Sequence, residues 1–554
     1  MGDTTPPPVA VIGMSCRVAG AETPAELWRL VDAGERRFTE VPPGRWPGLD
    51  RSLAATARAA LLERIDDFDA RFFGIAPRMA AWLDPQHRML LELAQHAVEN
   101  AGYDPVRLRD APIAVFAGAF MSDYDQLINL AGRADSAALP GTLMAFLANR
   151  VSYQFAWTGP SLVIDSACSS GLAALGIAVR GLQAGEYPMA LVGAANVINA
   201  GFYANNAYRG GALSPTGESV PFSASRDGYV RGEGGACVLL KPLDAALADG
   251  DPVHAVIRAV GTAHKGRAGG LTGSDAAAQE ALWRRTAAAA GIRVCDIGFL
   301  EAHGTGTPGG DGVELQALAQ ALDQGPQGRV RVGSVKANIG HLEAASGLIG
   351  MVKTALVLRH GRIPGVAGLG DADPALPTGG GRIEVSADGV AWPGGPGLRR
   401  AAVNSFGLGG TISQVILEEP PVRRLPPPAT QEPVLVPLSA GTPEGLAAQA
   451  RRLLLDLDDE PATDPAAVAW TLRHGRPARA ERLLLCVRDT ATLRAGLRGY
   501  LAGTGHPAVV TGADGDWEEL WGDRSVPPRV ALSGSVFDRK RHWFDENAPA
   551  PLPL

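Results

Sequence analysis

The sequence VIDSACSSGLAAL at residues 163–175 joins a short apolar strand, Ser161–Ile164, to a helix. Apolar residues at helical spacing follow this junction, and Gly185 predicts the end of the helix. Cys168 therefore lies where the helix begins, facing unpaired N–H groups and the positive end of the helix dipole. We expect this position to favour the thiolate, which is the nucleophilic form. The alternative is a buried structural cysteine, the commonest fate of a free cysteine.

Length and composition exclude several classes of protein. A chain of 554 residues is too long for one ordinary core, which predicts a large catalytic domain and something smaller. The 51 basic and 58 acidic residues give a net charge of −7, which argues against a nucleic-acid-binding protein. The five scattered cysteines form neither a metal spacing nor a disulfide framework. With no signal-peptide core and no apolar run near the roughly 20 residues of a membrane span, we expect a cytoplasmic protein without membrane contact.

Short apolar strands alternate with helices up to Glu419, which predicts a largely parallel α/β sheet. Helices are expected at Ala25–Gly34, Arg51–Leu62, Leu83 to about Asn100, and Ala145–Tyr153. Strands are expected at Pro8–Met14, Ile113–Gly118, Met189–Val197, Val253–Val260 and Ile297–Ala302. The strand Val330–Val335, a polar turn and the helical Leu342–Leu358 repeat the pattern around Cys168. We therefore expect a duplicated fold, with halves of about residues 8–250 and 251–419 whose central turns face each other.

Composition changes at Glu419, where a Pro- and Arg-rich stretch to Pro433 predicts a surface linker. We expect residues 420–505 to hold this linker and a small α/β domain. Its predicted elements are strands at Val434–Leu438 and Arg482–Val487 and helices at Glu444–Leu457, Ala466–His474 and Ala491–Ala502. Residues 506–554 are expected to form an extended tail that lies back across the main domain and ends in disorder from Asn547. Its expected apolar anchors are Trp517, Leu520, Trp521, Phe537, Trp543 and Phe544.

Two histidine motifs follow Cys168. In EAHGTGT, residues 301–307, a strand delivers His303 into a turn whose glycines allow close approach of a substrate and whose threonines offer hydrogen bonds. A buried histidine on its own is more often a satisfied core residue.

The second motif is KANIGHLE, residues 336–343. It places His341 at a helix start, where the dipole discourages protonation and a neutral imidazole can donate a hydrogen bond to an oxyanion. Lys336 adds fixed positive charge, and Glu343 is available to pair with it. One cysteine, two histidines and a lysine on such turns together favour a catalytic site over a structural interpretation.

Five longer motifs occur between Pro8 and Glu419. They are LDPQHRMLLEL at 83–93, DSACSSGLAAL at 165–175, GYVRGEGG at 228–235, EAHGTGT at 301–307 and VGSVKANIGHLEAASG at 332–347. Together they make the chain resemble the ketosynthase of modular polyketide synthases, in the thiolase superfamily. The resemblance implies an α-β-α-β-α layered fold, a homodimer, and decarboxylative Claisen condensation of a cysteine-bound acyl chain with a malonyl-type extender on an acyl carrier protein.

The resemblance also implies roles for the catalytic residues. Cys168 would carry the acyl chain as a thioester, and His303 and His341 would assist decarboxylation and stabilise the enolate. Lys336 would fix His303 electrostatically and support the charged intermediates. No metal and no bound redox cofactor are implied, because substrates arrive on the phosphopantetheine of the carrier protein.

The resemblance implies further roles for residues of two loops. The backbone N–H groups of Cys168 and Leu408 would form the oxyanion hole, within a glycine-rich hairpin where Phe406 and Gly407 would support the site. Thr305 and Thr307 would hydrogen-bond the pantetheine arm.

The C-terminal third is similar to further parts of such synthases. Residues 434–505 resemble the small domain that links the ketosynthase to an acyltransferase, and residues 516–544 resemble the segment that follows the acyltransferase. The acyltransferase itself is missing between them, which favours an arrangement served by a separate acyltransferase acting in trans.

Three stretches depart from the family pattern. The hairpin reads Ile412-Ser413-Gln414 where Asn-Ala-His is usual, residues 261–275 lack the usual Asn-x-Asp-Gly and Thr-x-Pro, and residues 309–312 read GGDG instead of LGDP. The altered hairpin leaves open a non-elongating acyl transfer by the same cysteine. A Cys–His hydrolase of another class and an inactive scaffold protein are further alternatives, but neither requires Lys336 or two histidines.

Overall fold

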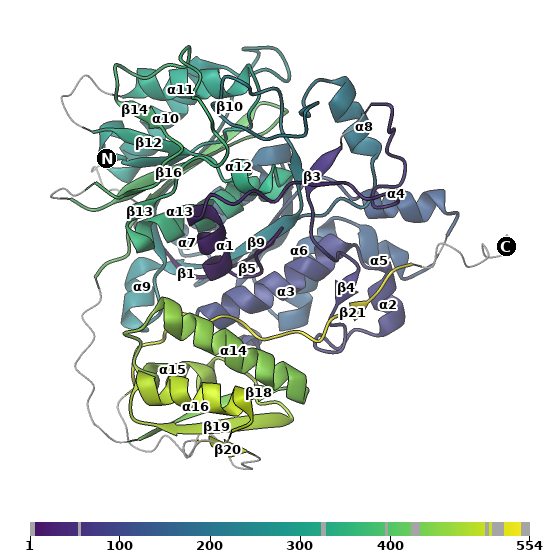
Figure 1. Ribbon diagram of the computed structural model, residues 1–554, viewed down its shortest axis with the longest axis vertical. Coiled ribbons are helices and arrows are strands. Elements are labelled where there is room, and N and C mark those ends of the chain that lie inside the picture. The colour runs from purple at the N-terminus through teal and green to yellow at the C-terminus, as the bar shows by residue number, and fades with distance from the viewer. Residues whose placement is uncertain are drawn as a thin grey trace.

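The computed structural model describes residues 6–53, 57–133, 135–322, 328–393, 397–422, 433–504, 509–511 and 526–544. Its centre is one 11-stranded sheet in the order β14-β12-β11-β16-β17-β10-β1-β9-β7-β5-β6 (Figure 1). Antiparallel pairing of β1 with β10 over Val9–Val11 joins two five-stranded halves, and β14 (Ile383–Val385) extends one edge.

The two halves have the same topology. The strands of the first are β1 (Val9–Val18), β5 (Ala114–Ala119), β6 (Ser161–Asp165), β7 (Ala190–Asn196) and β9 (Gly234–Pro242). Those of the second are β10 (Ala255–His264), β11 (Phe299–Glu301), β12 (Val330–Gly333), β16 (Arg400–Phe406) and β17 (Thr411–Glu418). In both halves the spatial order is third, second, fourth, fifth, first. This identity confirms the predicted duplication.

The sheet is less parallel than the sequence predicted. In each half, three neighbouring strands are parallel, the last strand of the half runs antiparallel beside them, and the first strand pairs antiparallel with that last strand. The strand β9, which the apolar pattern did not reveal, supplies one of these antiparallel neighbours.

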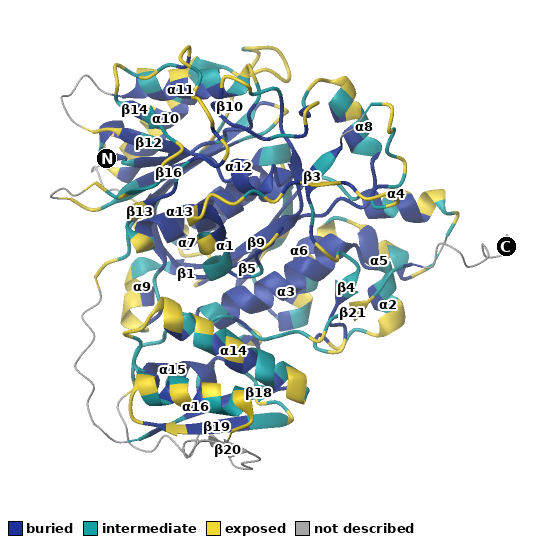
Figure 2. Ribbon diagram, in the orientation of Figure 1, coloured by how far each residue is buried: buried dark blue, intermediate teal, exposed yellow. Residues whose placement is uncertain are grey.

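Helices form three layers around the two half-sheets. Between them lie α7 (Ser170–Ala184) and α13 (Ser346–His360), which are buried along most of their length (Figure 2). The outer face of the first half is covered by α3 (Pro85–Asn100) and α6 (Ala145–Phe155), and that of the second by α10 (Ala276–Ala290) and α11 (Gly310–Ala321). The expected α-β-α-β-α layering is therefore present.

Small residues allow the central layer to pack closely. A Cβ added to Gly118 on β5 would lie 2.7 Å from the backbone nitrogen of Gly171 on α7. Because such a contact is too short for real atoms, a glycine is needed there for the helix to lie against the sheet. This contact sets the position of the helix that follows Cys168.

One helix predicted from the sequence is wrong. Residues 51–62 contain the strand β3 (Arg58–Ala60), which lies between β2 (Thr39–Glu40) and β8 (Arg231–Gly232). Alanine-rich sequence favours helix locally, but pairing with a distant strand overrides that preference.

The remaining helices of the main domain are short. They are α1 (Pro24–Asp32), α2 (Pro77–Trp82), α4 (Asp123–Leu130), α5 (Ala138–Thr142), α8 (Phe202–Arg209), α9 (Leu243–Ala248) and α12 (Lys336–Ile339). A two-stranded sheet of β13 (Arg362–Ile363) and β15 (Val390–Ala391) lies apart from the central sheet. No helix in the described ranges combines the length and apolar character needed to cross a membrane.

A second, smaller α/β unit follows the main domain and lies below it in Figure 1. Its sheet has the order β18-β19-β20, and its core is separate from the three clusters of the central fold. Its elements are β18 (Val434–Ala440), α14 (Pro443–Asp459), α15 (Pro465–His474), β19 (Glu481–Val487), α16 (Thr490–Ala502) and β20 (Val509–Thr511).

Residues 526–544 of the tail lie along the main domain, and β21 (Lys540–Arg541) pairs with β4 (Asp67–Phe68) (Figure 1). The Nε atom of Arg539 lies 2.9 Å from a carboxylate oxygen of Glu92 on α3. The Phe537 ring stacks on His96, with centroids 4.8 Å apart. The anchors expected at Trp517, Leu520 and Trp521, the segment from Asn547, and most of the linker, residues 423–432, lie outside the described residues.

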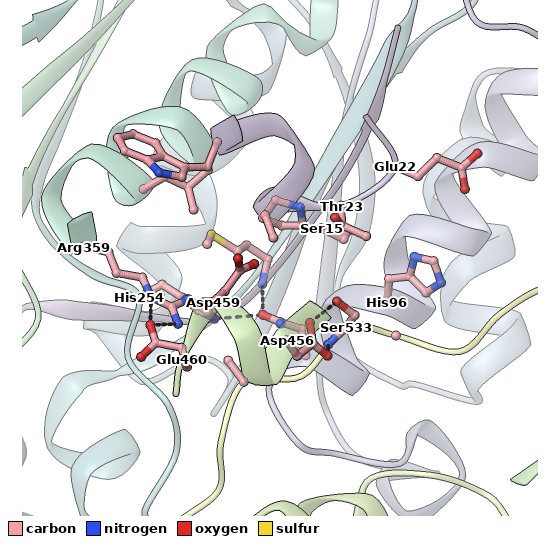
Figure 3. A pocket seen from close by; sticks show the side chains of 18 of the residues that line it. Ser15, Glu22, Thr23, His96, His254, Arg359, Asp456, Asp459, Glu460 and Ser533 are labelled. Carbon is pink, nitrogen blue, oxygen red and sulfur yellow. Dashed lines mark hydrogen bonds and ion pairs between the residues drawn. The ribbon is translucent and has the colours of Figure 1, made fainter. Parts of the chain in front are cut away.

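A cavity of about 70 Å³ remains where the main domain, α14 and the tail meet (Figure 3). Asp456 lines it and accepts hydrogen bonds from the backbone N–H and hydroxyl of Ser533, at 2.9 and 2.6 Å. Burial raises the pKa of this carboxyl to about 6. None of the catalytic residues expected from the sequence lines this cavity, so it is a feature of domain packing and not the active site.

Candidate active site

Cys168 lies in a 3-10 turn, Ala167–Ser169, between the end of β6 and the start of α7. The turn is fixed by hydrogen bonds. The hydroxyl of Ser170 accepts the Ser166 N–H at 2.9 Å and donates to the Ala119 carbonyl at 2.8 Å. The hydroxyl of Ser405, on β16 of the other half, donates to the Cys168 carbonyl at 2.7 Å. Both halves of the fold therefore hold the turn that carries Cys168.

The surroundings of Cys168 favour the thiol over the thiolate, which is opposite to the direction expected from the sequence. Burial raises its pKa to about 12, and the Glu343 carboxylate acts in the same direction, while Lys336 and the N–H groups of Leu408 and Cys168 lower it only in part. A helix dipole contributes about 0.3–1 kcal/mol, whereas each pKa unit corresponds to about 1.4 kcal/mol. Desolvation therefore outweighs the helix start. The sulfur accepts hydrogen bonds from the same two N–H groups that were expected to form the oxyanion hole.

His303 follows β11, and its ring meets that of His341 edge to face, with centroids 5.4 Å apart. Its Nδ1 accepts the Phe406 N–H at 3.3 Å. Burial and the charge of Lys336 hold its pKa well below the usual range for histidine, so the ring is neutral. A neutral ring whose Nδ1 is an acceptor carries its proton on Nε2.

His341 has the same tautomer for a similar reason. Its Nδ1 accepts the Glu343 N–H at 3.0 Å and lies 2.6 Å from the Ser346 hydroxyl. Burial, followed by the charge of Lys336, holds its pKa well below the usual range. It precedes the 3-10 turn Glu343–Ala345 that leads into α13. Two neutral imidazoles, each with an N–H on Nε2, therefore stand together.

The structure corrects the partner predicted for Glu343. This carboxylate accepts two hydrogen bonds from Arg231, at 2.8 and 2.9 Å, and both side chains are buried. The charges of Glu301, Glu314 and Cys168 act on Lys336 instead and favour its protonated form. Glu301 in turn pairs with Lys353 at 2.6 Å. The parallel bridge between Arg231 and His341 explains why Arg231, and not Lys336, reaches Glu343.

The hairpin between β16 and β17 packs directly on the cysteine turn. A Cβ on Gly407 would lie 2.2 Å from the Ser166 carbonyl oxygen, so only glycine fits there. The Phe406 and His303 ring centroids are 5.4 Å apart. The side chain of Leu408 is 49% exposed, while its N–H faces the Cys168 sulfur.

The two threonines predicted to contact the pantetheine arm lie in the turn after His303. The hydroxyls of Thr305 and Thr307 are 3.0 Å apart and hydrogen-bond to each other. Thr305 is buried, whereas Thr307 is partly exposed.

Sequence reasoning missed the buried charged residues that support these groups. They are Arg231, Glu301, Asp311, Glu314 and Lys353. The carboxylate of Glu314 accepts the N–H groups of His303 and Gly304 at 2.8 and 2.9 Å, and Asp311 accepts that of Gly306 at 3.1 Å. The sequence signal that could have revealed two of them is the pair Asp311 and Glu314, at the start of the helix α11 that follows the His303 motif.

Three family models match the chain. They are the N-terminal domain of beta-ketoacyl synthase over residues 7–246, its C-terminal domain over 254–369, and the ketoacyl-synthetase C-terminal extension over 373–479. The oxazolomycin ketosynthase domain OzmH KS7 of Streptomyces albus JA3453 is 33% identical, with a TM-score of 0.88 over 98% of this chain and 99% of that one. The ketosynthase from module 6 of the bacillaene synthase of Bacillus subtilis 168 is 28% identical, with a TM-score of 0.87 over 97% and 100%.

Curated relatives are much longer proteins. Polyketide synthase GfsA of Streptomyces halstedii is 39% identical over 91% of this chain and 7% of its own length. Erythronolide synthase EryA2 of Saccharopolyspora erythraea is 37% identical over 85% of this chain and 14% of its own length. The chain thus spans less than a third of these relatives. With a cysteine and two neutral histidines on facing turns of a duplicated fold, it belongs to the beta-ketoacyl synthase family, as a ketosynthase of the polyketide synthase type.

Proposed function

We propose that this chain catalyses decarboxylative Claisen condensation between an acyl group on Cys168 and a malonyl-type extender on an acyl carrier protein. In the first step, the sulfur attacks the incoming acyl thioester, and the thiol proton ends on the departing pantetheine thiol. The tetrahedral oxyanion accepts the N–H groups of Cys168 and Leu408, each such donor being worth about 3–4 kcal/mol of barrier. Thr305 and Thr307 would bind the pantetheine arm.

In the second step, the malonyl carboxylate leaves as CO₂ and the thioester becomes an enolate. Nε2–H groups of His303 and His341 donate to the enolate oxygen, while the enolate carbon attacks the acyl carbonyl and releases the Cys168 sulfur as a thiolate. Water then supplies the proton that restores the thiol. Burial and the charge of Lys336 keep both imidazoles neutral, and Phe406 and Gly407 hold the hairpin in place. The observation that carries this proposal is that both Nδ1 atoms already accept hydrogen bonds, which leaves two N–H donors for one oxygen.

Two variants test these roles. Cys168→Ala is expected to block acyl loading, because no other nucleophile replaces the sulfur. His303→Ala is expected to load normally but to release no CO₂ from malonyl carrier protein. Intact-mass spectrometry measures loading, and CO₂ release measures the second step. Full condensation by either variant would refute the assigned roles.

A non-elongating acyl transfer is the second candidate, because Ile412-Ser413-Gln414 alters the hairpin over the site. It predicts that the unmodified enzyme loads acyl groups but releases no CO₂ from malonyl carrier protein. The same assay on the parent enzyme therefore separates the two functions.

The partners we infer are an acyl carrier protein, a separate acyltransferase and a second copy of this chain, in the cytoplasm and without a bound cofactor. The short span between the small α/β unit and the tail supports the separate acyltransferase. We divide the chain into a ketosynthase domain at 8–419, a linker and flanking domain at 420–505, and a tail at 506–554. The homodimer is supported by β6, an edge strand of the described sheet, where Leu162 is 53% exposed, and by Tyr153 on the preceding helix α6, which is 86% exposed.

A further inference from the structure

Three successive residues of β16 hold the catalytic turns. Ser405 donates to the Cys168 carbonyl, and the Phe406 N–H donates to the His303 ring, as described above. The third residue, Asn404, donates from Nδ2 to Glu314 Oε1 at 2.9 Å. Because that same oxygen accepts the His303 N–H at 2.8 Å, Asn404 reaches the His303 turn through one carboxylate.

Gln414 lies opposite Asn404 in the β16–β17 ladder and is fully buried. Its Nε2 donates to Asn404 Oδ1 at 2.8 Å. Its own Oε1 has no hydrogen-bond partner among the described residues, so the polar contribution of Gln414 is the bond that it donates. An asparagine amide offers oxygen on one side and nitrogen on the other. A donor at residue 414 therefore turns the Asn404 nitrogen toward Glu314.

We propose that Gln414 is a positioning residue for decarboxylation, acting through Asn404 and Glu314 on the turn that carries His303. The inference rests on the proposed role of His303. It goes beyond that role because it assigns a task to a fully buried residue in the altered part of the hairpin.

Glu314 is a buried carboxylate, so the hydrogen bonds that it accepts from Asn404 and the His303 turn are needed to stabilise its charge. Burial raises the pKa of this carboxyl. The hydrogen bonds from the Gly304 N–H, the Asn404 amide and the His303 N–H lower it, as does the charge of Lys336, but they offset the effect of burial only in part. If the Asn404 amide turned its oxygen toward Glu314, one donor would be lost and two acceptors would face each other. The N–H groups of the His303 turn would then lose their fixed acceptor, and the imidazole would shift.

The test is Gln414→Glu, which keeps the size of the side chain and replaces the donor by an acceptor when ionised. At a pH high enough to ionise this buried carboxyl, we expect normal loading of Cys168 but CO₂ release slower by on the order of 100-fold, the cost of a small misplacement of a catalytic group. As the pH falls toward 6, the rate relative to the parent should recover, because a protonated carboxyl at this position can donate again. Gln279→Glu is the matched control, since Gln279 is also buried with an unpartnered Oε1 among the described residues but lies on α10.

Equal loss of loading and CO₂ release, or the same pH profile as Gln279→Glu, would overturn the inference. Gln414→Met, which is uncharged and cannot donate, covers the case in which Gln414→Glu does not fold. This variant should release CO₂ slowly at every pH, because it cannot donate a hydrogen bond, and it should load acyl groups normally. A rate of CO₂ release equal to that of the parent enzyme would also overturn the inference. If the parent enzyme itself releases no CO₂, the proposed function fails instead.

Discussion

The chemistry of single residues here depends on burial more than on helix position. Cys168 stands at a helix start and accepts two N–H hydrogen bonds, yet its thiol has a pKa of about 12. Only a small fraction of this sulfur is therefore the reactive thiolate at neutral pH.

This protonation state predicts how Cys168 reacts with iodoacetamide. The rate should rise about tenfold per pH unit from pH 7 to 10 without a plateau, because the thiolate fraction keeps growing below the pKa. Peptide mapping by mass spectrometry measures the rate at this cysteine, and Cys168→Ala confirms the assignment. A free cysteine, with a pKa of about 8.5, levels off near pH 9. A plateau below pH 9 for Cys168 would restore the thiolate that the sequence predicted.

The sequence could predict where Cys168, His303 and His341 stand, because a strand-to-helix turn is a local pattern. It could not predict their supports. Glu343 pairs with Arg231, which is 112 residues away, and Glu301 pairs with Lys353, which is 52 residues away. Charge partners depend on which strands become neighbours, so the nearest lysine in the sequence was the wrong choice for Glu343.

At the scale of elements, helices with clear capping residues were predicted correctly, whereas strands without a clear local pattern were missed. The helix α3 was predicted nearly to its ends, because Asp84 caps it through Gln86 N–H at 2.8 Å and Gly102 follows it with a φ of 78°. The strands β3 and β9 were missed. Their conformation is set by pairing with strands far along the chain, which no local periodicity records.

The hairpin over Cys168 should tolerate alanine at one glycine and not at another. Gly407→Ala would place a methyl group 2.2 Å from the Ser166 carbonyl, so the hairpin must move and the Leu408 N–H leaves the sulfur. We expect loading to slow by on the order of 100-fold, the usual loss for one oxyanion donor. Gly409→Ala is the control, because a Cβ there meets nothing within 4 Å. Equal loading rates of the two variants, measured by intact mass, would contradict this role of the hairpin.

The buried pair Arg231–Glu343 should stabilise the turn of His341 only as a pair. The side chains are 4% and 1% exposed, so Arg231→Met leaves a buried carboxylate without its partner. We expect a loss of about 3–5 kcal/mol in the free energy of unfolding. Adding Glu343→Gln to Arg231→Met should recover part of it. Urea unfolding followed by tryptophan fluorescence measures both, and an additive loss in the double variant would argue against a paired interaction.

At the scale of the whole molecule, duplication explains why the site forms between the two halves. Cys168 follows the third strand of the first half, and His341 follows the third strand of the second, while His303 follows the second strand of that half. Equivalent turns therefore approach each other across the central helix layer. In the proposed mechanism the nucleophile comes from the first half and both imidazole donors come from the second, so that mechanism requires both halves.

The same architecture leaves one edge of the central sheet available to a second copy of the chain. The edge strand β6 leads directly to Cys168, so a partner paired along it would also brace the nucleophile turn. Leu162→Arg places a charge on this edge and should give a monomer by light scattering at micromolar concentration, with slower acyl loading. Leu247→Arg, at a residue 47% exposed on α9, is the control and should leave a dimer. A Leu162→Arg protein that stays dimeric would place the interface on another surface and remove the proposed link between association and the position of Cys168.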